Sequence, residues 1–144
     1  MTIMARRDLI LGLLVATLAG CNAAQQAEPE PRPVVDLSPA ALSVSQQDSL
    51  DQAQAAKDSG DYEEALALFR EILADNPVAT DALVGIGDVY LAEGLWDRAE
   101  PAFARAAKLE PRNFDAQYGH GVTLQMLDRF VEAVRAYHRA LTID

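Results

Sequence analysis

The sequence has 144 residues, of which 50% are hydrophobic and 6% aromatic, and its formal net charge is −10 at pH 7. The abundance of alanine favours close-packed helices over a sheet, because alanine is the best helix former, and so acidic a chain repels phosphate backbones, which disfavours general nucleic-acid binding. The only cysteine is Cys21, which excludes an intramolecular disulfide and a thiolate metal cluster.

The segment 1–20 has the parts of a secretory signal peptide. Arg6 and Arg7 form a charged segment, and an uninterrupted apolar run follows from Leu9 to Ala19. That run holds about 11 residues, whereas a helix that spans a bilayer needs roughly 20. Two arginines are also a normal feature of an ordinary secretory signal, so we prefer that interpretation to a twin-arginine signal.

The signal ends in Leu18-Ala19-Gly20-Cys21, which resembles the lipobox of bacterial lipoproteins. This resemblance implies that Cys21 is linked to diacylglycerol and becomes the acylated N-terminus of a membrane-anchored protein, since several acyl chains hold a protein firmly. It also implies a place in the bacterial cell envelope, facing the periplasm. Asn22 stands where enterobacterial lipoproteins of the inner membrane carry Asp, which favours the outer membrane. The alternative is an ordinary leader with a chance cysteine.

Residues 21–45 read as a flexible tether that follows the leader. Four prolines, at positions 29, 31, 33 and 39, interrupt any helix, because proline lacks an amide hydrogen and restricts the preceding residue. We therefore expect an extended, solvated spacer. Ser38-Pro39 suits the start of one short helical turn.

From residue 46 onward the sequence repeats at one constant spacing. The recurring residues are two aromatic positions, an alanine, a glycine and a helix-closing proline. They are Tyr62, Trp96 and Phe130; Ala65, Ala99 and Ala133; Phe69, Phe103 and Tyr137; Gly87 and Gly121; and Pro77 and Pro111. Apolar residues between them recur at steps of three and four, so each unit predicts two helices joined by a tight turn.

Local residue types explain how each unit would fold. Gly60 and Gly94 stand where the first helix must end in a left-handed residue, and Asp128 takes that place in the last unit. The recurring alanines are expected where the two helices cross, and the second set of rings is expected between neighbouring hairpins. Pro101 lies early in its helix, where a lost amide costs little.

This pattern resembles the tetratricopeptide repeat, and the spacing of the recurring residues equals the period of that repeat, about 34 residues. The resemblance implies an all-α solenoid of helix-turn-helix hairpins over residues 46–144, with units at 46–79, 80–113 and 114–144. The first unit departs from the pattern, with Ser49 and Ala53 in place of the usual aromatic residue and glycine.

The same resemblance implies a concave groove lined by the first helix of each unit. The expected groove residues are Leu50, Asp51, Gln54, Asp58, Asp81, Val84, Asp88, Leu91, Asp115, Tyr118, Val122 and Met126. An apolar floor with an acidic margin suits a partner peptide with apolar anchors and Lys or Arg. The groove lacks the Lys, Arg and Asn set of the subclass that grips a C-terminal carboxylate. The alternative is an ordinary solvated helix face.

The sequence contains no recognisable catalytic or metal-binding pattern. His120 and His138 are too few for a usual zinc site. We expect His120 to be packed and His138 to be exposed. Gly85 and Gly87 belong to the repeat rather than to a nucleotide-binding loop. We therefore predict a protein that is not an enzyme and needs no cofactor or metal.

The predicted function is a membrane-anchored scaffold for protein–protein interaction in envelope assembly, such as pilus biogenesis or secretion. The layout resembles that of the assembly lipoproteins of Flp/Tad-type and type IV pili. Two alternatives stay open: the substrate-recruiting part of a larger enzyme continuing past residue 144, and a passive, self-associating structural lipoprotein. Because no polar capping helix follows the third unit, we expect further repeats or a partner at that end.

Overall fold

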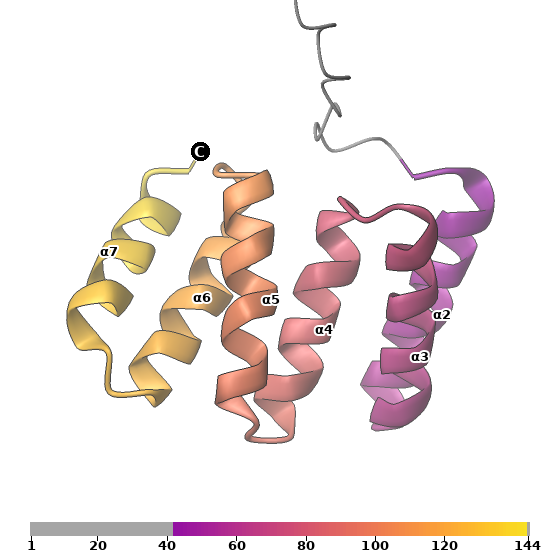
Figure 1. Ribbon diagram of the computed structural model, residues 1–144, viewed down its shortest axis with the longest axis horizontal. Helices are drawn as coiled ribbons and strands as arrows, with labels where there is room; N and C mark the ends of the chain where they lie inside the picture. Colours follow the sequence, from indigo (N-terminus) through magenta and orange to yellow (C-terminus); the bar gives the residue numbers. More distant parts are fainter. Residues whose placement is uncertain (1–41, 144) are drawn as a thin grey trace, which may run out of the picture. The chain divides into compact units, whose positions relative to one another are not determined.

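The computed structural model describes residues 42–143, and the expectations for the leader, Cys21 and the tether lie outside these residues. The described residues form six α-helices and no strand (Figure 1). They are α2 (Val44–Ser59), α3 (Tyr62–Asp75), α4 (Thr80–Ala92), α5 (Trp96–Leu109), α6 (Phe114–Met126) and α7 (Phe130–Leu141). The prediction of an all-α solenoid is confirmed, and none of these helices is long and apolar enough to cross a membrane.

The helices start in the phase of the sequence repeat. The second helix of each hairpin begins at the first recurring aromatic residue, which is Tyr62, Trp96 or Phe130. The first helix α2 begins at Val44, ahead of residue 46, because Ser43 forms a capping box with Gln46. The hydroxyl of Ser43 accepts a hydrogen bond from the Gln46 amide, and the Gln46 side chain accepts one from the Ser43 amide.

The turn within each hairpin is closed by one residue with a left-handed backbone. Gly60 and Gly94 have φ angles of 83° and 72°, and Asp128 has a φ of 59°. The three predicted left-handed positions are therefore correct. Glycine adopts this conformation without steric cost, whereas aspartate only tolerates it.

Buried aromatic rings and glycines hold the hairpins together. Phe69 and Phe103 are fully buried. A Cβ atom added to Gly85 would overlap the ring of Phe69, and one added to Gly119 would overlap that of Phe103. The rings of Phe69 and Phe103 thus lie directly against the first helix of the next hairpin, so the helix residue at each contact must be glycine.

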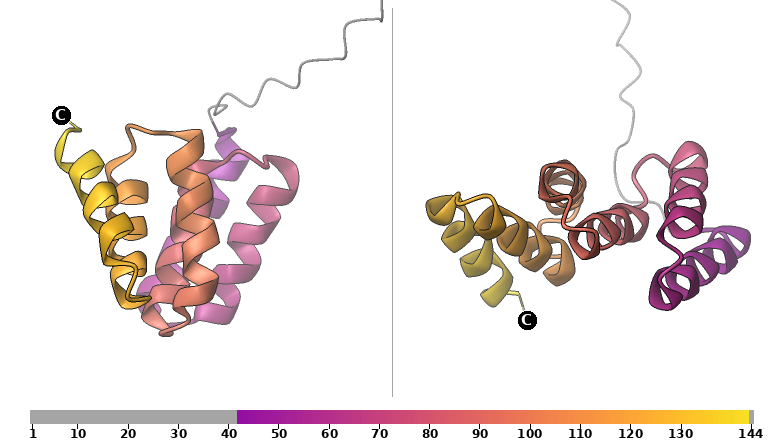
Figure 2. Two further views of the ribbon diagram at one scale, coloured as in Figure 1. Left: turned by 60° about the vertical axis from the view of Figure 1, so that its left-hand side comes forward. Right: turned by 90° about the horizontal axis from the view of Figure 1, so that it is seen from below.

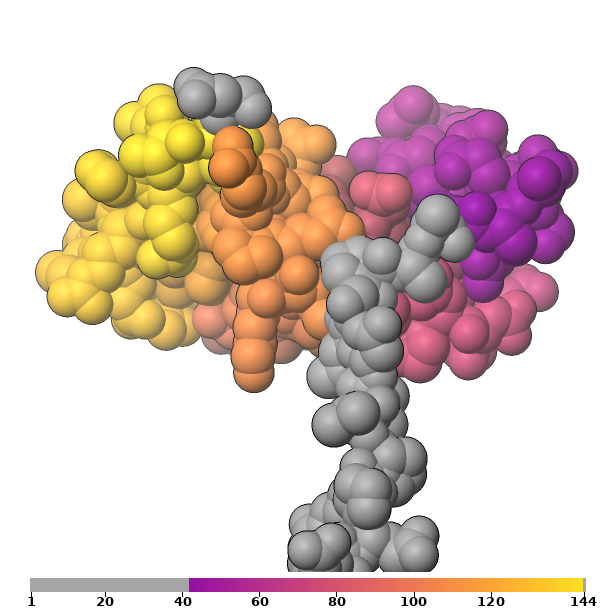
Figure 3. All heavy atoms as spheres, turned by 90° about the horizontal axis from the view of Figure 1, so that it is seen from above, coloured from indigo at the N-terminus to yellow at the C-terminus, as the bar shows by residue number. Residues whose placement is uncertain are grey.

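The three hairpins follow one another in a row from α2–α3 to α6–α7 (Figures 2 and 3). The first helices also contact one another, since α2 packs on α4 and α4 packs on α6. No such contact joins α3, α5 and α7 among the described residues. The first helices therefore share one face of the row.

Candidate protein-binding groove

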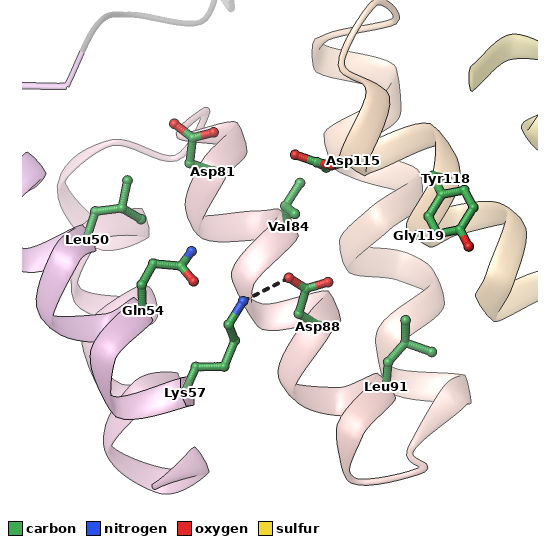
Figure 4. Close-up of a pocket in the computed structure, with 10 residues that line it drawn as sticks. All are labelled: Leu50, Gln54, Lys57, Asp81, Val84, Asp88, Leu91, Asp115, Tyr118 and Gly119. Carbon is green, nitrogen blue, oxygen red and sulfur yellow. Dashed lines mark hydrogen bonds and ion pairs between the residues drawn. The ribbon is translucent and has the colours of Figure 1, made fainter. Parts of the chain in front are cut away.

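A groove of about 450 Å³ runs across the shared face of the first helices. Figure 4 shows the side chains of three helices around it. Helix α2 contributes Leu50, Gln54 and Lys57; α4 contributes Asp81, Val84, Asp88 and Leu91; and α6 contributes Asp115, Tyr118 and Gly119. Because neighbouring hairpins supply every wall, the groove exists only when the repeats are stacked.

Eight of the twelve residues predicted for a groove line this one, and the structure brings them together from three helices. They are Leu50, Gln54, Asp81, Val84, Asp88, Leu91, Asp115 and Tyr118. The other four, Asp51, Asp58, Val122 and Met126, are not among the lining residues, whereas Lys57 and Gly119 line the groove and were not predicted. Peptide binding by these residues stays a prediction.

The four displaced residues have a physical explanation in the repeat phase. Lys57 lies one full repeat before Leu91, so it is the equivalent residue of α2, whereas Asp58 is one position further round the helix. Asp51 and Met126 are likewise one position beyond the equivalents of Val84 and Leu91, a phase at which Gly119 alone lines the groove, and Asp51 and Asp58 are exposed. Val122 is in phase but lies at the α6 side, where no further described hairpin forms a wall.

The charged residues of the groove are unevenly paired. The Nζ atom of Lys57 lies 3.1 Å from a carboxylate oxygen of Asp88. Asp81 and Asp115 make no ion pair with any described residue. Partial burial, Glu110 and Asp115 together raise the pKa of Asp81 above its ordinary value. This part of the groove therefore carries uncompensated negative charge, and a cationic side chain would stabilise it.

Apolar and aromatic surface lies beside these carboxylates. Leu50 is buried, Val84 and Leu91 are half-buried, and Tyr118 is 50% exposed. The Tyr118 ring stacks on that of Phe114, with 5.7 Å between ring centroids. An exposed tyrosine held by a stacked neighbour provides a large, ordered contact area for a partner.

The histidines do not form a site with other ligands. The Nε2 atom of His120 lies 3.3 Å from Glu100 Oε1, while its buried Nδ1 has no hydrogen-bond partner among the described residues. His138 is exposed. Within residues 42–143, no group of three His, Cys, Asp or Glu side chains is arranged to hold a metal ion.

A family model described as "Tetratricopeptide repeat" matches residues 50–100 and 86–144. A probable UDP-N-acetylglucosamine–peptide N-acetylglucosaminyltransferase, SPINDLY of Petunia hybrida, is 28% identical over 110 residues. RNA polymerase-associated protein CTR9 of Caenorhabditis elegans is 37% identical over 65 residues. These matches cover 76% and 44% of this chain but only 12% and 6% of the relatives.

Solved structures share the same arrangement of helices. One of them, MamA AMB-1, has a TM-score of 0.60 and 28% sequence identity, and the similarity covers 68% of this chain and 54% of the MamA chain. The second tetratricopeptide repeat domain of Spaghetti (RPAP3), bound to the HSP90 peptide SRMEEVD, has a TM-score of 0.66 at 18% identity. That similarity covers 69% of this chain and 92% of the other, and it concerns the fold alone.

Proposed function

The chain belongs to the tetratricopeptide repeat family, whose members are scaffolds for protein–protein interaction, and we propose that its groove binds a partner segment with both apolar and basic side chains. The observation that carries this proposal is the position of Asp81 and Asp115, which lack ion-pair partners among the described residues and lie beside apolar surface. A Lys or Arg of the partner would pair with these carboxylates, while its apolar residues would pack on Val84, Leu91 and Tyr118.

The sign of the charge distinguishes this groove from one that takes an acidic peptide. The peptide named in the Spaghetti structure, SRMEEVD, contains two glutamates and ends in aspartate. Asp81, Asp88 and Asp115 in this groove would repel such a peptide, and Lys57 is already paired with Asp88. The partner proposed for this chain therefore has the opposite charge.

The proposal includes a place for the scaffold in the cell. The signal-like residues 1–20 and the lipobox-like Leu18-Ala19-Gly20-Cys21 support a lipoprotein anchored through Cys21 in the bacterial envelope. We propose that it serves envelope assembly there, such as pilus biogenesis or secretion. The alternatives, the recruiting part of a longer enzyme and a passive self-associating protein, predict further coding sequence beyond residue 144 and concentration-dependent sedimentation respectively.

The groove is tested by photocrosslinking in cells from Leu91 and Tyr118, with mass spectrometry to identify the captured protein. A matched control places the crosslinker at Ala67, which is exposed on α3 and does not line the groove. We expect one dominant partner from the groove positions and none from Ala67. The variant Asp81→Lys with Asp115→Lys should abolish the crosslink, while Glu93→Lys, outside the groove, should retain it.

Two results would reject the groove as a recognition site. One is the absence of any crosslink from both groove positions, and the other is a crosslink that persists in the doubly charge-reversed variant.

The anchor is tested separately with Cys21→Ser. The wild-type protein should take up labelled palmitate and partition into detergent, and the variant should do neither. A variant that still partitions with the detergent would show that Cys21 is not the site of attachment.

A further inference from the structure

The outer face of α7 carries a stripe of exposed apolar side chains. Val131, Val134 and Leu141 are 68%, 66% and 82% exposed, and no other described helix covers them. Helix α7 packs on α6 alone and lies at one end of the row in Figure 1. Three large aliphatic side chains on one helix face, with so much of each in solvent, are unusual unless another surface packs there.

The preceding hairpins show what covers the same positions. The residues one repeat before Val134 and Leu141 are Glu100 and Ala107 on α5, and those before them are Leu66 and Leu73 on α3. Leu66 and Ala107 are buried, and Leu73 and Glu100 are half-buried. In both cases the neighbour is the first helix of the next hairpin, because α4 packs on α3 and α6 packs on α5. Val134 and Leu141 thus form an open copy of an interface that occurs twice among the described residues, whereas the equivalents of Val131, Asp97 and Glu63, are exposed.

The two occupied copies also define the helix that fits. Ala82 and Ile86 of α4 are buried in the same cluster as Leu66 and Phe69 of α3, and Gly85 of α4 lies against the Phe69 ring. Helix α6 repeats the arrangement with Gly119 against Phe103. Tyr137 is the equivalent ring on α7. Because α7 resembles the aliphatic α3 more than α5, the α4 face is the better template for its occupant.

We propose that the outer face of α7 binds an amphipathic helix of a second partner protein, with a glycine or alanine over Tyr137 and aliphatic residues against Val134 and Leu141. Arg135, His138 and Arg139 on α7 favour acidic residues at the margins of that helix. The inference rests on the proposed function as a scaffold and adds a binding surface to it. The protein would then join a segment in the groove to a helix at the end of the row.

A second copy of this chain does not fit the open interface. In a head-to-tail stack, α2 would have to present the face that α4 presents to α3. The α2 residues equivalent to Ala82, Gly85 and Ile86 are Asp48, Asp51 and Gln52. Stacking would place the side chain of Asp51 against the Tyr137 ring, where α4 and α6 have glycine, and would place polar Asp48 and Gln52 beside Val134 and Leu141, which is unfavourable.

The probe for the test is a fluorescent peptide with the sequence of residues 79–94, which contains α4. Its binding to the full chain is measured by fluorescence anisotropy. We expect the variant Val134→Glu to weaken binding about tenfold or more, because a buried unpaired carboxylate is costly. The variant should fold, because α5 carries Glu100 at the equivalent position. The matched control is Val44→Glu, which alters an exposed valine at the other end of the row.

A substitution in the peptide and a second peptide with the α6 sequence provide a further check. Replacing Gly85 by leucine in the 79–94 peptide should weaken binding, since the leucine side chain would meet the Tyr137 ring. In the molecule, Glu100 of α5 lies 3.3 Å from His120 of α6. A peptide of residues 113–128, which carries that histidine, should therefore bind Val134→Glu better than wild type. A simple loss of folding would not produce this reversal.

The groove variant distinguishes binding at the outer face of α7 from binding in the groove. Binding of the 79–94 peptide should survive Asp81→Lys with Asp115→Lys, which abolishes groove crosslinking. Three results would overturn the inference: no peptide binding, binding that Val134→Glu leaves unchanged, or binding lost with the groove variant. Sedimentation of the full chain gives a fourth, because self-association that Val134→Glu abolishes would make a second copy the occupant.

Discussion

Gly119 has a backbone that any residue in a helix could adopt, yet its position excludes a side chain. Its Cα lies directly under the Phe103 ring, which is fully buried. In an open helix, Gly→Ala stabilises by up to about 1 kcal/mol, but here a methyl group would force the ring or the helix to move. We expect Gly119→Ala to lower the free energy of unfolding by about 1–3 kcal/mol, as measured by urea denaturation. A stabilised variant would mean that the hairpins are not packed through this contact.

Asp81 makes the stability depend on pH in a defined direction. Partial burial and two neighbouring carboxylates raise its pKa above the ordinary value, so the folded protein binds the proton more tightly than the unfolded chain does. Its contribution to stability is therefore greatest below the ordinary pKa and falls as pH rises through the raised one. Asp81 also lies in the first turn of α4, where a negative charge is favourable. The prediction therefore concerns how the free energy of unfolding changes with pH.

The variant Asp81→Asn tests this expectation. Relative to wild type, its free energy of unfolding should increase between pH 4 and pH 7, as followed by urea denaturation at each pH. Asp97→Asn, an exposed change in the first turn of α5, is the matched control for the loss of a carboxylate at a helix start. A difference between Asp81→Asn and wild type that stays constant with pH would contradict the raised pKa.

The turn between α6 and α7 offers a test at the level of elements. Asp128 closes it with a φ of 59°, where the two preceding hairpins have glycine. The left-handed conformation is strained for non-glycine residues, and glycine costs some entropy in the unfolded chain. We expect Asp128→Gly to stabilise the protein by about 0.5–1 kcal/mol, the difference between these effects. The reciprocal change, Gly94→Asp, should destabilise it; thermal unfolding measures both, and a stabilised Gly94→Asp would contradict the argument.

The elements were easier to predict from sequence than the groove. Tyr62, Trp96 and Phe130 mark the starts of three helices, and Gly60 and Gly94 mark turns, because each depends on local backbone preference. Membership in the groove depends on the angle at which neighbouring hairpins stack, so a one-residue error selects the wrong side chain. Lys57 was missed for that reason, although its place one repeat before Leu91 was a usable signal. The ring-to-glycine contacts between hairpins needed the three-dimensional structure.

Within the described residues, the molecule is a row in which each hairpin contacts only its neighbours, and its two ends differ. At one end α2 packs on both α3 and α4 and presents polar residues outward. At the other end α7 packs on α6 alone and presents valine and leucine. The last hairpin also has the smallest buried cluster, Leu124, Ala133 and Ala136. Since the stability of such arrays comes from single repeats and their interfaces, the two ends should not open equally.

We therefore expect native-state hydrogen exchange to proceed from the α7 end. Amides of α4, which packs on α2, α3, α5 and α6, should exchange slowest, those of α2 at an intermediate rate, and those of α7 fastest. Mass spectrometry of exchanged fragments measures this order. Slower exchange in α7 than in α2 would contradict it, as would one common rate set by global unfolding. Because a ligand stabilises the state that it binds, a helix bound to Val134 and Leu141 should slow exchange in α7 first, whereas a peptide in the groove should slow exchange in α4 and α6.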